Sequence, residues 1–209
     1  TYRHLQSLEV AGFVEQNPLT KHYRLGPVVI QLAHTREATV PRRESAKSAL
    51  FTLAENTGET AHASVLSGDT IYALASCESL RHGTRAIIDV TTLPLHATAS
   101  GLCALAFGPS DLMDVAAKNL KGFTAETPTS TDALQVLVHA TRTTGFGRTA
   151  RTFEAEITSL SAPVFDQTGL FAGAVSVATV ASRFTRDLEV NIMANLATAS
   201  REITRNWGG

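Results

Sequence analysis

Cysteine is scarce in this sequence, and long hydrophobic runs are absent. The 209 residues include two cysteines, Cys77 and Cys103, whose separation matches neither a zinc motif nor a disulfide framework. We therefore expect reduced thiols and no metal centre. No apolar run reaches the roughly 18 residues of a membrane span, and the opening residues lack the pattern of a signal peptide. The sequence predicts a cytoplasmic protein with no membrane partner.

Strong net charge is also missing. The formal net charge is −1 at pH 7, and hydrophobic residues make up 44% of the chain. That much apolar material is sufficient for one substantial core and a small appendage. Because the chain as a whole is not basic, any contact with nucleic acid requires a local patch.

Motifs of several enzyme classes are lacking as well. The sequence has neither the G-x-S-x-G turn of α/β-hydrolases nor the H-E-x-x-H pair of zinc peptidases. Residues 145–150 spell G-x-G-x-x-A, but a dinucleotide site needs a strand before this motif and a helix after it. Here a helix is predicted before the motif and strands after it. We therefore predict no cofactor and no catalytic residue.

What is present begins with a distinct pattern in the first 40 residues. Tyr2, Leu5 and Leu8 have helical spacing, and strand-like runs at 13–15 and 22–25 flank a turn. A helix followed by a hairpin is half of a winged helix-turn-helix, which we assign to residues 1–26. Residues 27–40 are rich in apolar side chains and end before a proline, which favours a linker helix. The larger domain then comprises residues 41–209.

The larger domain mixes helices and hairpins. We predict helices over 42–57, 99–107, 110–119, 131–144 and 186–206, and strands over 59–66, 70–76, 85–90, 160–165 and 170–178. The strands form hairpins interrupted by helices, without the βαβ alternation of a parallel sheet. This order indicates an α+β fold.

Short motifs along the chain resemble one family. Tyr-Arg-x-Leu-x-x-Leu-x-x-x-Gly-Phe-Val and Tyr-Arg-Leu-Gly occur in the first 26 residues, and 57–60, 93–99, 145–146, 162–164 and 182–185 follow in order. Together they are similar to the IclR family of bacterial transcription regulators over nearly the whole chain. The resemblance implies a GAF-like effector domain, with a curved antiparallel sheet flanked by helices, preceded by a partial winged helix-turn-helix. It also implies a homodimer or homotetramer, and two family helices that would precede Thr1.

The resemblance further implies that the first segment binds a palindromic operator DNA. Side chains outside the apolar face of the first helix would then reach the major groove, and the wing would neutralise phosphates. The DNA-contacting residues that we expect are Thr1, Arg3, His4, Ser7, Lys21, His22 and Arg24. The alternative is a solvated helix and hairpin, because the three cations of residues 1–26 are opposed by two carboxylates.

A second site is predicted where a loop enters the helix at residue 99. Unpaired amides and the helix dipole at such a position favour a carboxylate or another anion. The simpler interpretation is that Thr98 or Ser100 only caps the helix.

By resemblance, a pocket for a small-molecule effector, for which we expect a carboxylate or another metabolite, comprises Ala99, Ser100, Gly101, Thr149, Ile157, Ser159, Ser176 and Ala178. Many relatives have an acidic run where this chain has residues 149–152, including Arg151, and a cysteine near Ser159. These departures favour a neutral or anionic effector and disfavour a metal. Ser159 and Ser176 as small sheet residues bonded to backbone are the alternative.

Three functions from different classes are compatible with these patterns. The first is a DNA-binding transcription regulator whose operator affinity depends on a bound metabolite. The second is a GAF-like sensor module without a DNA-reading role, which leaves the helix and wing of residues 1–26 unexplained. The third is an enzyme that uses Ser159, His96 or Cys77, for which no supporting motif is present. We expect the first.

Overall fold

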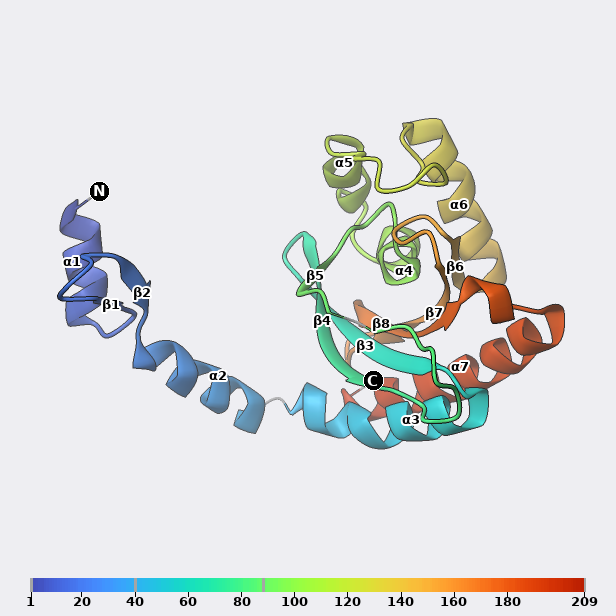
Figure 1. Ribbon diagram of the computed structural model, residues 1–209, viewed down its shortest axis with the longest axis horizontal. Coiled ribbons are helices and arrows are strands. Elements are labelled where there is room, and N and C mark those ends of the chain that lie inside the picture. The colour runs from blue at the N-terminus through green and yellow to red at the C-terminus, as the bar shows by residue number, and fades with distance from the viewer. Residues whose placement is uncertain (1, 40, 88, 209) are drawn as a thin grey trace. The chain divides into compact units, whose positions relative to one another are not determined.

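The computed structural model describes residues 2–39, 41–87 and 89–208, without the side chains of residues 36–39. The chain divides into two compact units, Thr1–Arg42 and Arg43–Gly209 (Figure 1). None of the described helices is both long enough and apolar enough to cross a membrane.

The first unit consists of a helix, a hairpin and a second helix. These are α1 (Tyr2–Val10), β1 (Val14–Gln16), β2 (Tyr23–Leu25) and α2 (Pro27–Thr39). The hairpin pairs Val14 with Leu25, and Asn17 Oδ1 closes its turn by accepting the amides of Leu19 and Thr20 at 2.9 and 3.0 Å. Against our expectation of an inward-facing apolar stripe on α1, Tyr2 is 67% and Leu8 42% exposed, and no residue of this helix is buried.

The second unit is built on six strands. They are β3 (Thr60–Ser67), β4 (Thr70–Cys77), β5 (Thr92–Leu93), β6 (Gly147–Ala150), β7 (Ile157–Phe165) and β8 (Phe171–Val180). Their order across the sheet is β5-β4-β3-β8-β7-β6, and every neighbouring pair is antiparallel. The central pair, β3 and β8, brings together a strand from the beginning of the domain sequence and a strand from near its end.

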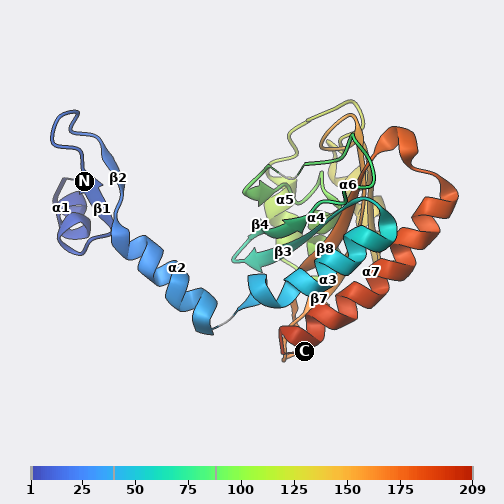
Figure 2. The same ribbon diagram turned by 60° about the horizontal axis from the view of Figure 1, so that its bottom comes forward.

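Helices cover both faces of this curved sheet (Figures 1 and 2). One face carries α3 (Arg42–Thr57) and α7 (Arg186–Asn206), and the other carries α4 (Ala99–Phe107), α5 (Leu112–Ala117) and α6 (Thr131–Thr144). A short 3-10 helix, η1 (Ala181–Arg183), connects β8 with α7. This is the α+β, sheet-and-helix architecture predicted from the sequence.

The two faces of the sheet differ in polarity because side chains alternate along each strand. Residues that face α3 and α7 are apolar and belong to one core: Ala61, Ala63, Leu160, Val175 and Val177. The alternate residues on the other face include polar side chains at neighbouring positions in the register, among them His62, Ser159, Ser161 and Ser176. A polar sheet face beneath α4 is therefore available for a binding site.

Sequence and structure differ most in three segments, and β7 also begins at Ile157, three residues before the strand predicted over 160–165. The strand predicted over 85–90 is a loop at its described residues, and β5, two residues further on, pairs with β4 instead. The helix predicted over 110–119 is shortened to α5, Leu112–Ala117. The four-residue strand β6 had no predicted bounds. The apolar character of 85–90 has another role, because Ala86, Ile87 and Val90 line a cavity.

Candidate ligand-binding site

A cavity of about 60 Å³ lies between the polar face of the sheet and the start of α4. This space is sufficient for several water molecules or part of a small ligand. Its walls come from β3, the loop before β5, the start of α4, strands β6 to β8, and the turn between β6 and β7. The lining residues are His62, Ala86, Ile87, Asp89, Val90, Leu93, Ala97, Thr98, Ala99, Ser100, Thr149, Thr152, Phe153, Glu154, Ile157, Ser159 and Ala178.

The first residues of α4 line this cavity. Thr98 caps the helix, since its Oγ1 accepts the Gly101 amide at 3.1 Å, and the Leu102 amide bonds the Thr98 carbonyl at 2.9 Å. The amides of Ala99 and Ser100, which lie between Thr98 and Gly101, have no acceptor within the helix. Both residues line the cavity, so the positive end of the helix dipole faces it.

Beneath the cavity, three serine hydroxyls form a chain. Ser176 Oγ donates to Ser161 Oγ at 2.8 Å, and Ser161 donates to the Val175 carbonyl at 3.1 Å. Ser100 Oγ lies 2.8 Å from Ser176 Oγ and completes the chain from α4 across β8 to β7. Since Ser176 uses its proton on Ser161, Ser100 acts as the donor to Ser176. These hydrogen bonds between serines fix the start of α4 against the sheet.

His62, on β3, faces the cavity without a partner for one ring nitrogen. It lies opposite Ser176 in the β3–β8 register, is 5% exposed, and lines the cavity. Its buried Nδ1 forms no hydrogen bond. Burial lowers the pKa of the imidazole from 6.5 to about 4, so the ring is neutral at pH 7.

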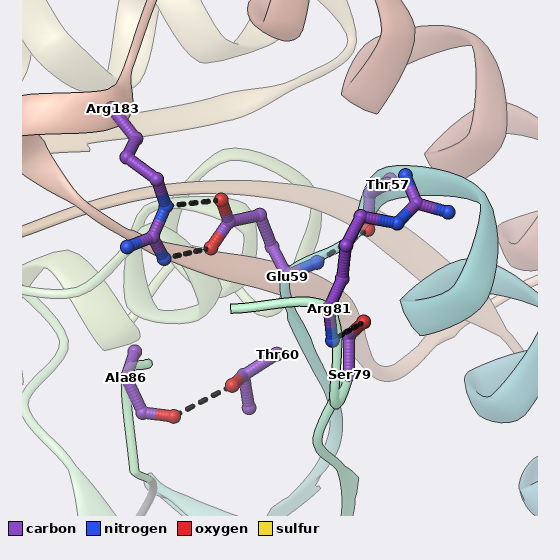
Figure 3. Close-up of polar contacts among 7 residues, drawn as sticks. All are labelled: Thr57, Glu59, Thr60, Ser79, Arg81, Ala86 and Arg183. Carbon is purple, nitrogen blue, oxygen red and sulfur yellow. Dashed lines mark hydrogen bonds and ion pairs between the residues drawn. The ribbon is translucent and has the colours of Figure 1, made fainter. Parts of the chain in front are cut away.

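The loop after β4 forms one wall of the cavity. It is anchored to the sheet, as Figure 3 shows, and also to α3. Thr60 Oγ1 donates to the Ala86 carbonyl at 2.6 Å, and Arg81 Nη2 donates to the Glu55 carbonyl at 2.7 Å. Close to the first anchor, Glu59 accepts two hydrogen bonds from Arg183, at 3.0 Å from Nε and 2.8 Å from Nη2. These contacts set the position of the wall relative to β3.

Six of the eight residues expected in the pocket line this cavity: Ala99, Ser100, Thr149, Ile157, Ser159 and Ala178. Gly101 and Ser176 are not among the lining residues. Gly101 allows a close approach, because a Cβ there would meet the Leu95 carbonyl oxygen. Ser176 is fully buried and holds the serine chain.

The charged side chains of the site differ from those inferred from the sequence. Arg151, from which we inferred a preference for neutral or anionic effectors, is not a lining residue; Asp89 and Glu154 are, and both are exposed. Sequence reasoning missed these carboxylates and also His62. The sequence indicated the position of His62 only through the alternation of side chains along β3, which places His62 on the same face of the sheet as Thr60.

The residues of the enzyme hypothesis are separated in the structure. Ser159 lines the cavity, whereas His96 and Cys77 do not. The His96 Nε2 lies 2.9 Å from the Lys121 carbonyl, and its ring lies 5.7 Å from that of Phe123. Burial, followed by the nearby carboxylates, raises the pKa of Cys77, which disfavours a thiolate nucleophile.

The residues expected to contact DNA lie in the first unit. Arg3, His4 and Ser7 are on α1, while Lys21, His22 and Arg24 are on the hairpin, and all six are exposed. Thr1 lies outside the described residues. Arg24 forms an ion pair with Glu15 at 2.6 Å across the hairpin, and Lys21 has φ 60° at the turn.

A helix-and-wing unit joined to an α+β domain that contains a cavity is the plan of a ligand-responsive DNA regulator. The family model of the bacterial transcriptional regulator IclR C-terminal domain matches residues 38–205. The chain belongs to the IclR family of transcription regulators.

Named relatives agree with this membership. The HTH-type transcriptional regulator XynR of Escherichia coli is 29% identical, over 98% of this chain and 82% of XynR. The KdgR regulator of the same organism is 27% identical, over 99% of this chain and 80% of KdgR. These names describe regulators and not enzymes.

Solved structures show the same architecture. A putative IclR regulator from Silicibacter sp. TM1040 has a TM-score of 0.94 and 36% identity, covering 100% of this chain and 83% of that one. An IclR homologue from Microbacterium hydrocarbonoxydans, solved with 4-hydroxybenzoate, has a TM-score of 0.77 at 21% identity, covering 99% and 84%. At 21% identity, the similarity to the Microbacterium structure is evidence for the fold alone.

Proposed function

We propose that this regulator binds operator DNA through residues 1–26 and that a small carboxylate in the cavity controls its operator affinity. Residues 27–40 then connect this head to the effector domain, residues 41–209. The observation that supports this proposal best is that one cavity is lined both by the first residues of α4 and by His62, whose Nδ1 has no hydrogen bond. The 4-hydroxybenzoate bound by the Microbacterium homologue supports a carboxylate ligand.

The protein acts in the cytoplasm as a homodimer or homotetramer on a palindromic operator. A twofold assembly presents two identical heads to two half-sites, so operator symmetry follows protein symmetry. The effector shifts the population between forms that differ in operator affinity. Because this coupling is reciprocal, operator DNA changes effector affinity by the same factor.

Filling the cavity tests the effector half of this proposal. Ser159 lines the cavity and is only partly buried, so Ser159→Leu places a larger apolar side chain inside it without replacing a core residue. Operator sequences selected from random duplexes provide the probe, and a carboxylate library provides candidate effectors. We expect Ser159→Leu to keep operator binding and to lose the effector response.

The matched control is Ser67→Leu, an exposed position at the end of β3, which should retain both properties. Circular dichroism of both variants checks their folding. An effector response that persists in a folded Ser159→Leu variant would place the effector elsewhere. Failure of the wild-type chain to select any duplex would count against the DNA-binding half.

A further inference from the structure

His62 Nδ1 is a buried polar atom that the protein leaves unpaired. The side chain is 5% exposed, and an unsatisfied buried donor or acceptor is destabilising. Its register partners across the sheet are Ser176 on β8 and Ser76 on β4, and neither of them forms a hydrogen bond with this nitrogen. His62 thus lines the cavity, and its Nδ1 has no hydrogen-bond partner in the protein.

A second set of groups converges on the same cavity. The amides of Ala99 and Ser100 begin α4 and have no intrahelical acceptor, and Ser100 is 1% exposed. In the tautomer that carries the proton on Nδ1, the neutral imidazole of His62 is a donor, and it then requires an acceptor just as the two helix amides do. A carboxylate has two oxygens that satisfy several donors at once.

The outer part of the cavity has the opposite character. Asp89 and Glu154 line it from the loop before β5 and from the turn between β6 and β7, and both are exposed. Among the described lining residues, every charged side chain is acidic at neutral pH. A second negative charge on a ligand would face these carboxylates, whereas a hydroxyl or ammonium group would donate to them.

From this polarity we infer that His62 determines effector specificity: it binds the carboxylate of a monocarboxylate whose other end carries a hydroxyl or ammonium group facing Asp89 and Glu154. This inference rests on the proposed effector function of the cavity. Dicarboxylates of the same length are excluded by the acidic outer part. Neutral amides bind weakly because they lack charge-assisted hydrogen bonds.

Binding also changes the proton affinity of His62. Burial holds its pKa at about 4 in the free protein, and an adjacent carboxylate favours the protonated ring, which raises that pKa. The other titratable groups that line the cavity are Asp89 and Glu154. Carboxylate binding near pH 5 therefore takes up protons, and affinity increases as the pH falls toward that value.

The test uses two matched ligand sets. The aromatic set is 4-hydroxybenzoate, 4-hydroxybenzamide and terephthalate, and the aliphatic set is 4-hydroxybutyrate, 4-hydroxybutanamide and succinate. Calorimetry measures affinity and proton uptake, and imidazole NMR signals of His62 report contact at millimolar ligand. We expect the hydroxy acid of at least one set to bind at least about tenfold more tightly than its amide and dicarboxylate and to shift the His62 signals.

Two variants of similar size isolate the role of the nitrogen. His62→Asn places an amide nitrogen close to the position of Nδ1 and should retain hydroxy-acid binding within a few-fold. His62→Leu removes the donor and should weaken hydroxy-acid binding at least about tenfold. His139→Leu, at an exposed position on α6, is the control and should not change affinity.

Several results would overturn the inference: equal binding of dicarboxylate and hydroxy acid, unchanged affinity in a folded His62→Leu variant, or no His62 shift with any carboxylate tested. If a ligand of other chemistry, such as an amine, changes operator affinity and loses that effect in Ser159→Leu, the proposed function stands and this inference fails.

Discussion

At the residue scale, His62 links the stability of the effector domain to pH. The unfolded chain has an ordinary histidine pKa of 6.5, whereas burial lowers the pKa to about 4 in the folded protein. The unfolded state therefore binds more protons between these values. The stabilising contribution is complete above pH 6.5 and is lost as the pH falls toward 4, by about 3 kcal/mol in total.

Urea unfolding at pH 5 and pH 7 measures this contribution. Wild-type protein should lose about 2 kcal/mol more unfolding free energy between these pH values than His62→Asn, which has no titrating group. His139→Asn replaces an exposed histidine and should behave as wild type. Equal losses in wild type and His62→Asn would mean that folding does not lower the pKa of this imidazole.

Individual residues also show which parts of the site can be predicted from the sequence alone. Ala99 and Ser100 were placed at a helix start from the loop-to-helix pattern, and Ser159 and Ala178 came from family resemblance. His62 has no local partner in sequence. It reaches the site because β3 pairs with β8, which puts it opposite Ser176, more than a hundred residues away. Such a register follows from tertiary pairing and not from local spacing.

At the scale of elements, an ion pair holds the beginning of β3 to η1, which follows β8 (Figure 3). Glu59 is 1% exposed, while the Arg183 side chain is 25% exposed. The Glu59 hydrogen bond, opposed by desolvation, raises the pKa of Arg183. Removing the arginine would leave a buried carboxylate with no cation, which is more costly than losing an exposed pair.

We therefore expect Arg183→Met to lower the unfolding free energy by about 3–5 kcal/mol. The double variant Glu59→Gln/Arg183→Met should recover much of this loss, because no buried charge remains. Lys47→Met breaks an ion pair with Glu44 whose side chains are 61% and 69% exposed, and it should cost at most about 1 kcal/mol. Urea unfolding of the wild type and these three variants measures the differences. A double variant no more stable than Arg183→Met would assign the loss to packing.

Elements with strong local signals were predicted most closely. Four helices have the bounds expected from their apolar periodicity and from the residues that end them: 42–57, 99–107, 131–144 and 186–206. For example, Ser130 caps α6 by accepting the Ala133 amide, and Gly145 ends it with φ 79°. The loop at 85–90 was mistaken for a strand, since an apolar run that lines a cavity has the composition of a buried strand.

At the scale of the whole molecule, the two compact units carry different chemistry. The larger unit holds the cavity, and the first unit holds every residue expected to contact DNA. The charge of residues 1–26 is modest, and one of their three cations, Arg24, is already paired with Glu15. We therefore expect non-specific attraction to DNA to depend mainly on Arg3 and Lys21, which have no ion pair among the described residues.

Salt dependence of binding to non-specific duplex DNA tests this assignment. Each phosphate contact contributes about 0.9 to the slope of log affinity against log salt concentration. Lys21→Ala should reduce the slope by about that amount, because its ammonium lies at the exposed turn of the hairpin. Glu15→Gln should raise affinity at low salt, since it frees Arg24 for a phosphate. Lys118→Ala, an exposed lysine of the larger unit, should change neither quantity. If Lys118→Ala reduces the slope as much as Lys21→Ala does, the attraction is spread over the protein and the hairpin is not a DNA-contacting wing.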